Sequence, residues 1–288
     1  MGKMSLIELD LKPIADVANN LINKVSEAVG WIATRDTLEK DAIQTYIKEI
    51  ENSNLSPIEK AALLSKANVT IKQYINTHDV LKIAVDNLES TNKAEDVDND
   101  WITQFMDLAK NVSNHEFQLL WGNLLASECN NPGSIPKSVM FILQKMDKED
   151  ADCFMKLSSI VVNVCGEYAP LVFDDFYALD KEGPYRKLKL EYDDLCQLET
   201  LGLIKMEHGI FAGGLMIDVR YDSKYKSEIV YFGNMMKIKD GLRTVEGGSV
   251  MFTKDGKALY NAVKPEELDG FWSEIIEKQY SKYNAGKE

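Results

Sequence analysis

Residues 100–157 read DWITQFMDLAKNVSNHEFQLLWGNLLASECNNPGSIPKSVMFILQKMDKEDADCFMKL, and this stretch sets the fold class. Its apolar residues recur at intervals of three and four, which is the spacing of one face of an α-helix. Polar or turn-forming residues interrupt the pattern three times. The stretch therefore predicts four consecutive helices, over residues 101–112, 114–128, 136–146 and 147–161.

Helix-start signals support these boundaries. Ser113 and Glu116 have the spacing of a capping box, in which each side chain accepts a hydrogen bond from the other residue's backbone N–H. The turn at residues 130–133 cannot continue a helix, and Pro136 suits the first turn of the next one. The expected starts are at Asn99 or Asp100, Ser113, Ser134 and Asp147.

Several pieces of this stretch resemble, in order and spacing, the signature of an uncharacterised bacterial family called domain of unknown function 2806. The pieces are Asp100-Trp101-Ile102, Phe105, Val112-Ser113, Leu120-Trp121-Gly122, Leu124 to Glu128, and Pro132-Gly133-Ser134. The family is similar to the abortive-infection alpha proteins, so the resemblance implies a role in bacterial defence against phage. It brings no established catalytic residues. The chain departs from the pattern at Lys137-Ser138-Val139, where we expect a basic residue and Thr before the apolar helix.

Within that motif we expect Trp101, Trp121, Glu128, Pro132, Gly133 and Ser134 to be structural. The two tryptophans lie on the apolar faces of their helices, where packing alone accounts for them. Glu128 ends an apolar helix, and we expect it to accept hydrogen bonds from backbone donors of the next helix, near Ser134. A catalytic acid at Glu128 is the alternative. Glu116 is more than three helical turns away, too far to share a proton or a metal with it.

The chain has 288 residues, enough for two domains with real cores. The polar run from Glu89 to Asn99 breaks the helical pattern and is the best linker. We divide the chain into an N-terminal helical region (1–92), a central helical motif (93–146) and a winged-helix-like domain with a long wing and a C-terminal helix (147–288). The expected fold is mainly α with a small α+β part.

The net charge is -13, from 33 basic and 46 acidic residues. This charge repels nucleic-acid phosphate and anionic lipid at long range. The sequence has no apolar run of about twenty residues, so we expect no membrane span and a cytoplasmic protein. Its four cysteines are too widely spaced for a Cys-x-x-Cys ligand pair, so we expect buried thiols, no metal site and no cofactor.

The N-terminal third reads as three helices, near residues 14–32, 37–51 and 57–88. The first is strongly amphipathic, and packing against a partner helix is favoured over lying on a membrane, because few basic residues mark its polar face. The third begins with a capping box and a proline, Ser56-Pro57-Ile58-Glu59. Its length suits an antiparallel helix pair or a dimer seam, so a homo-oligomer through these helices is one expectation.

In the C-terminal part of the sequence, long helical patterns give way to shorter helices and strand-like runs. A helix at residues 191–201 precedes Gly202-Leu203-Ile204, and Phe252-Thr253 with Gly256 precedes a further helix. This order is similar to that of winged-helix regulators. The strand-like runs between and around these pieces are residues 215–221, 227–232, 235–238 and 248–252.

A basic and aromatic cluster precedes the helix that would read DNA in a winged helix. Its possible nucleic-acid contacts are Tyr185, Arg186, Lys187 and Lys189. The helix itself carries the acids Glu191, Asp193, Asp194 and Glu199, where a DNA reader would carry basic or amide side chains. We therefore favour contact with a protein partner, and we keep a nucleic-acid-binding regulator as the alternative.

Catalytic signals are weak. The three histidines, His78, His115 and His208, are scattered, and no Gly-x-Ser-x-Gly elbow or phosphate-binding Gly-x-x-x-x-Gly-Lys motif is present. An enzyme centred on Glu128 is therefore the least favoured of three readings. The most favoured interpretation is a protein-interaction or regulatory protein in anti-phage defence.

Overall fold

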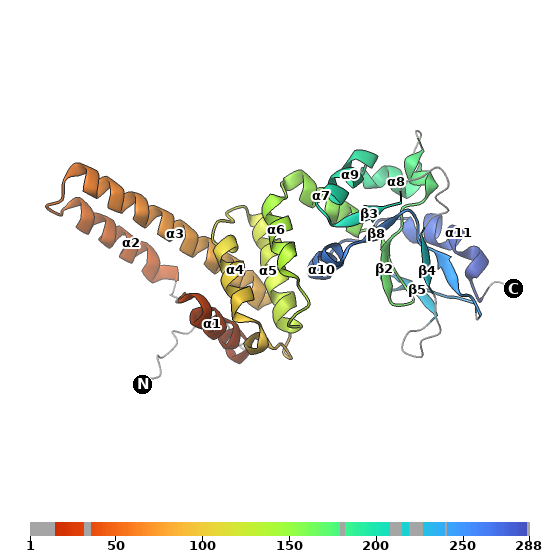
Figure 1. The fold of residues 1–288 in the computed structure, drawn as a ribbon, viewed down its shortest axis with the longest axis horizontal. Coiled ribbons are helices and arrows are strands. Elements are labelled where there is room, and N and C mark those ends of the chain that lie inside the picture. Colours follow the sequence, from red (N-terminus) through yellow and green to blue (C-terminus); the bar gives the residue numbers. More distant parts are fainter. Residues whose placement is uncertain are drawn as a thin grey trace. The chain divides into compact units, whose positions relative to one another are not determined.

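The computed structural model describes residues 15–31, 36–178, 182–207, 215–218, 227–239 and 241–286. The protein is mainly helical with a smaller α+β part, as the sequence predicts (Figure 1). Two compact units make up the chain, Met1–Met140 and Phe141–Glu288. The first contains the whole expected N-terminal region and most of the expected central motif.

Three helices begin the first unit. α1 (Ala15–Val29) buries an apolar face on α3 (Pro57–Asp86) and α4 (Asn99–Ala109), so its amphipathic stripe packs on partner helices. α2 (Asp36–Glu51) and α3 form a helical hairpin (Figure 1). The expected capping box starts α3: the Ser56 hydroxyl accepts from the Glu59 N–H, and the Glu59 carboxylate accepts from the Ser56 N–H at 2.9 Å.

The next two helices begin one residue away from their expected caps. Asp98, not Asn99 or Asp100, caps α4 by accepting from the Trp101 N–H at 2.8 Å. The prediction that Ser113 caps the next helix is wrong. The Asn114 side chain caps α5 (His115–Asn130) by accepting from the Phe117 N–H at 3.2 Å. Ser113 and Asn114 both have the residue type of a cap, and the structure uses the second.

The core of the first unit forms where α3, α4 and α5 meet. Phe105 lies at its centre, stacked on Trp101 and tilted against Trp121, with ring centroids 5.1 Å away in both cases. α3 and α5 make the largest helix–helix contact in the described chain. The expected N-terminal and central parts therefore share one core.

The segment expected to be a linker, Glu89 to Asn99, is folded onto α5. It contains the 3₁₀ turn η1 (Ala94–Asp96), and Ala94 and Val97 are buried. The Lys93 N–H donates to the Cys129 carbonyl at 2.7 Å. Because its backbone donors and apolar side chains are used in this way, this polar run belongs to the first unit.

Two helices lead into the second unit. α6 (Lys137–Lys145) crosses the boundary, and α7 (Lys148–Ser158) has the expected Asp147 cap, with Asp150 completing a capping box. The expected extension of α7 to Val161 is wrong. The β-branched run from Ile160 forms strand β1 (Val161–Val164) instead, because β-branched side chains fit a pleated surface better than a helix.

The strands of the second unit form three antiparallel groups. The largest is a four-stranded sheet in the order β2 (Glu167–Pro170), β1, β5 (Glu228–Tyr231) and β6 (Asn234–Lys237). β3 (Ile204–Met206) pairs with β8 (Val250–Phe252), and β4 (Met216–Asp218) pairs with β7 (Thr244–Glu246). The residues expected to form one long wing therefore supply two strands to a sheet begun by β1 and β2.

Short helices fill the rest of this unit. They are η2 (Asp174–Tyr177), α8 (Gly183–Leu188), α9 (Tyr192–Thr200), α10 (Lys254–Ala262), a π-helical turn (Trp272–Ile276), α11 (Glu277–Gln279) and η4 (Ser281–Tyr283). The remainder of the expected strand at 215–221, the Gly213-Gly214 pair and His208 lie outside the described residues.

The contacts of Thr253 and Gly256 explain the motif that was noted in the sequence before α10. The Thr253 hydroxyl accepts from the Gly256 N–H at 3.0 Å and donates to the Gly202 carbonyl at 2.6 Å. A Cβ atom on Gly256 would lie 1.8 Å from the Leu203 carbonyl oxygen. The motif therefore joins the start of α10 to the turn that follows α9, and only glycine fits at its last position.

Candidate functional site

Glu128 lies in the last turns of α5 with 2% of its surface exposed. Its Oε1 atom accepts from the Gly133 N–H at 2.6 Å, and its Oε2 atom accepts from the Ile135 N–H at 2.8 Å. Gly133 has φ = +83°, a conformation that favours glycine, and it turns the chain back toward the carboxylate. Glu128 therefore ties the end of α5 to the loop before α6, through backbone donors on either side of Ser134, the position that the sequence indicated.

Opposing effects act on the Glu128 carboxyl group. Burial raises its pKa above the usual value, the backbone N–H groups of residues 133–135 act in the opposite direction, and the nearby Asp98 charge adds to the rise. Both carboxylate oxygens are already hydrogen-bonded and covered. A substrate has no access to them, so the geometry suits a structural tie.

The two motif tryptophans are buried, at 4% exposure for Trp101 and 1% for Trp121. The Trp101 indole N–H donates to the Ile135 carbonyl at 2.9 Å. Ile135 thus uses its N–H for Glu128 and its carbonyl for Trp101. The motif residues from α4, α5 and the following loop form one hydrogen-bonded cluster around this residue.

Gly122 is a motif residue whose role the sequence did not reveal. A Cβ atom added to it would lie 2.4 Å from Cγ2 of Ile83 and 3.0 Å from the Val80 carbonyl oxygen. Real Cβ atoms do not approach so closely, so glycine at this position lets α5 lie directly against α3. Its place after Trp121 on a helical face is the signal that could have indicated close packing.

The four residues of the basic and aromatic cluster do not form one contact surface, because one of them is buried. Tyr185, one of the possible nucleic-acid contacts, is buried: it is 1% exposed, it donates to the Leu171 carbonyl at 2.8 Å, and burial raises its pKa. Its ring packs edge-on against Phe176 and Phe271. An aromatic residue next to cations on the chain is here part of the core.

The three cations of the cluster are exposed. The Lys187 ammonium pairs with the Asp269 carboxylate at 2.7 Å, which raises the pKa of Lys187 and lowers that of Asp269. Arg186 lies on the outside of α8, and Lys189 follows it with φ = 52°. Part of the positive charge is therefore neutralised within the protein.

The outer face of α9 carries tyrosine and acid. Tyr192 is 46% exposed and lies 6.2 Å, centroid to centroid, from the exposed ring of Tyr177. Glu191 and Asp193 are exposed beside it. Three of the four acids of this helix also have partners within the protein. Glu191 and Asp194 form a capping box at the start of α9, in which the Asp194 carboxylate accepts from the Glu191 N–H at 2.7 Å. Glu199 accepts from the Met206 N–H at 2.7 Å.

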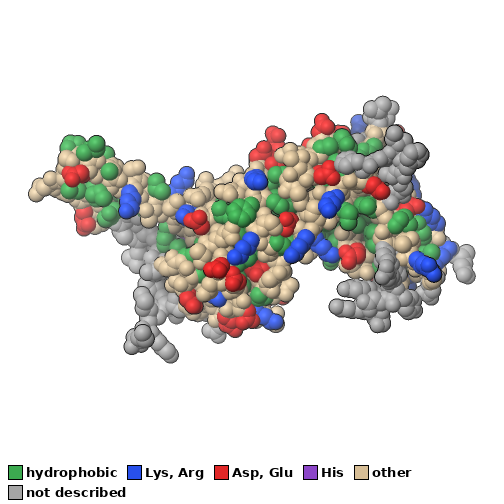
Figure 2. Space-filling model, in the orientation of Figure 1, with side chains coloured by type: hydrophobic (Ala, Val, Ile, Leu, Met, Phe, Trp, Pro, Cys, Tyr) green, Lys and Arg blue, Asp and Glu red, His purple; other side chains and the backbone are tan. Residues whose placement is uncertain are grey.

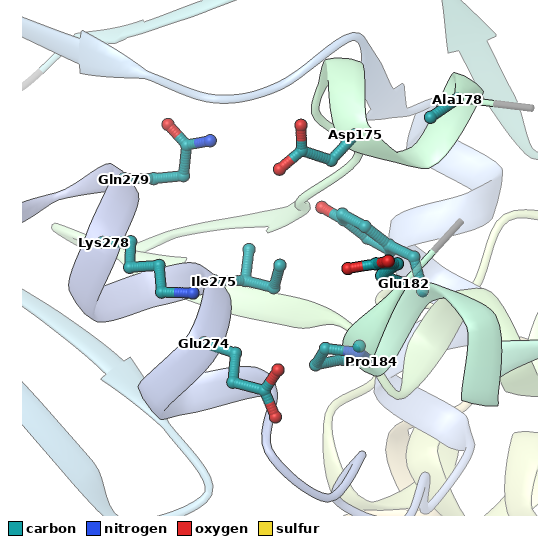
Figure 3. Close-up of a pocket in the computed structure, with 10 residues that line it drawn as sticks. Asp175, Ala178, Glu182, Pro184, Glu274, Ile275, Lys278 and Gln279 are labelled. Carbon is teal, nitrogen blue, oxygen red and sulfur yellow. The ribbon is translucent and has the colours of Figure 1, made fainter. Parts of the chain in front are cut away.

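A pocket of about 380 Å³ opens in the second unit between η2, α8 and the π-helical turn (Figure 3). Its charged side chains are Asp175, Glu182, Glu274 and Lys278. Three carboxylates against one ammonium favour a cationic group. The described lining residues include no histidine, cysteine or serine, so they supply no nucleophile–base pair.

The described residues contain neither a metal-ligand cluster nor a helix that could span a membrane. In that part of the chain, no three His, Cys, Asp or Glu side chains come together as a metal site. Within the same residues, every helix is too short or too polar to cross a membrane.

The structure thus defines a mainly helical protein with a small α+β unit, in which the motif side chains join α4, α5 and the following loop. Residues 66–276 match the family described as protein of unknown function DUF2806, and the chain belongs to that family. The match extends well beyond the motif that first indicated it and covers parts of both units. No curated protein and no solved structure matches the chain.

Proposed function

We propose that this protein is a regulatory or interaction protein of bacterial anti-phage defence, of the abortive-infection type, and that it acts in the cytoplasm. In this proposal its second unit is an elaborated winged helix, and the outer face of α9 contacts a protein partner. The defence role rests on the likeness of the family to abortive-infection alpha proteins. The mode of action rests on the surface of the second unit.

The order of elements supports a winged-helix origin. α7, α8 and α9 precede β3, which pairs with β8 and leads into α10. The Ser249 N–H donates to the Val172 carbonyl at 2.8 Å, so the segment before η2 lies beside the start of β8 as a short first strand would. The β1–β2 hairpin and the strands β4 to β7 are then additions to that plan.

The observation that carries the proposal is the chemistry of the outer face of α9. Tyr177 and Tyr192 present two exposed rings, and tyrosine is enriched at protein interfaces. Glu191 and Asp193 surround them with negative charge, which repels phosphate and attracts a basic protein surface. A partner with Arg or Lys side chains around an apolar centre fits this face.

A nucleic-acid-binding regulator is the second candidate, because Arg186, Lys187 and Lys189 expose three cations within four residues. The Lys187–Asp269 pair weakens that argument. Tyr185 cannot stack on a base, because its ring is buried.

Matched variants distinguish the two candidates in a phage-challenge assay on cells that express the full chain. Asp193→Lys and Tyr192→Ser change the outer face of α9, and Arg186→Glu with Lys189→Glu reverses the basic cluster. All four positions are exposed, so circular dichroism and cellular abundance should match the unmodified protein. The proposal expects loss of protection from the α9 variants and retained protection from the reversed cluster. The opposite outcome would favour the nucleic-acid regulator, and protection absent in the unmodified protein would exclude the defence role.

A further inference from the structure

Four residues of α3 form a row on the side of the helix opposite α2. They are Ile58, Ala62, Ser65 and Val69, and we call this row the outer seam. The side that faces α2 is marked by Lys60, whose ammonium donates to the Glu51 carbonyl at 2.7 Å. Its 4-3-4 spacing is that of a coiled-coil seam. All four side chains are exposed, with Ile58 at 79% and Val69 at 54%, whereas Ala67, half a turn away, is buried. Figure 2 shows hydrophobic side chains gathered at this end of the hairpin.

The sizes of the outer-seam residues read large, small, small, large. If a second α3 lies antiparallel on a two-fold axis between Ala62 and Ser65, Ile58 faces Val69 of the other copy and Ala62 faces Ser65. Each large side chain then meets a large one, and each small one meets a small one. The small central pair lets the helix axes approach to the lower end of the usual range of about 8–10 Å.

The charges flanking the outer seam have the same symmetry. Glu59 and Lys66 lie on one flank of the helix, seven residues apart, and both are exposed. In the antiparallel pair Glu59 of one copy lies about 3 Å along the helix axis from Lys66 of the other, within reach of the two side chains, and the reverse pair forms as well. Parallel pairing in register would instead place like charges at the same level.

We propose that α3 pairs with α3 of a second copy of this chain, antiparallel along the outer seam. A two-fold contact of this kind is self-complementary, which is what the order of sizes and charges provides. The contact spans about three helical turns, so the dimer is weak, with a dissociation constant of about 10–100 µM. The α3 contact lies in the first unit, so its test is independent of the test of the proposed function of α9.

Sedimentation equilibrium of the full chain at increasing concentration tests the proposal. We expect the mass to rise from 32.5 kDa toward twice that value. Val69→Glu should weaken the dimer at least tenfold. Ile75→Glu is the matched control, because Ile75 is also exposed on α3 but lies about 100° away from the seam, and it should leave the dimer unchanged. A chain that stays monomeric up to about 300 µM, a dimer that survives Val69→Glu, or one that Ile75→Glu abolishes as well would overturn the proposal.

A charge exchange tests the antiparallel geometry. Lys66→Glu and Glu59→Lys should each weaken self-association, and an equimolar mixture of the two should associate as well as the unmodified chain, since both cross-pairs are again opposite in sign. Glu59 also belongs to the capping box, so the helix content of Glu59→Lys is checked first. If that variant unfolds, the Val69 and Ile75 pair still decides. Two well-folded variants whose mixture fails to associate would contradict the antiparallel pairing.

Discussion

Gly122→Ala should destabilise the protein even though alanine is the better helix former. In the interior of a helix this exchange normally stabilises by about 1 kcal/mol. Here the new Cβ atom would lie 2.4 Å from Cγ2 and 2.6 Å from Cβ of Ile83, and 3.0 Å from the Val80 carbonyl oxygen. The contact with Cβ involves the branch point of the Ile83 side chain, so no rotation about χ1 removes it.

Overpacking of this kind costs about 1–3 kcal/mol, because α3 and α5 must move apart along their contact. After subtraction of the gain in helix propensity, we expect a net loss of about 1–2 kcal/mol in the free energy of unfolding. Urea melts followed by circular dichroism measure it.

A double-mutant cycle with Ile83→Ala provides the control. Ile83→Ala removes Cγ2, the closest atom, but keeps Cβ, so it relieves part of the overlap. The loss from both changes together should therefore fall short of the sum of the single losses by about 0.5 kcal/mol or more. A Gly122→Ala protein that is more stable than the unmodified one, or a cycle with no coupling, would refute the close approach of α5 to α3.

The remaining predictions concern side chains near the same cluster. Trp121→Ala should cost about 3–5 kcal/mol in urea melts, because it empties a buried aromatic site beside Phe105; a loss below about 1 kcal/mol would mean that the indole is exposed. Glu128→Gln should cost about 1–3 kcal/mol, since one of its two backbone N–H partners would face an amide NH₂ group; an unchanged melt would contradict the tie. Burial raises the pKa of Cys129 to about 12, so its thiol stays protonated at pH 8 and should resist iodoacetamide in the folded protein but not in urea.

The helical part of the fold could be predicted because its signals are local. The apolar spacing of α4 to α7 and the capping box at Ser56 each lie within a few residues. The errors arose where two local solutions compete. Ser113 and Asn114 are both good caps, and the apolar run after Leu157 suits a helix or a strand until pairing with β2 selects the strand.

The candidate site was harder to predict because its contacts join distant parts of the chain. The surroundings of Tyr185 are set by Leu171, Phe176 and Phe271, which no local pattern connects to it. The double hydrogen bond of Glu128 was closer to prediction, since its partners follow within seven residues. The role of Gly122 depends on Ile83 of another helix and became visible only in three dimensions.

We propose that the second unit contacts protein and not nucleic acid, and a titration of duplex DNA at several salt concentrations checks this claim. The exposed acids of α9 and the net charge of -13 predict binding weaker than about micromolar at physiological salt, without sequence preference. A sequence-selective complex with a nanomolar Kd would contradict the claim and make the chain a nucleic-acid-binding regulator.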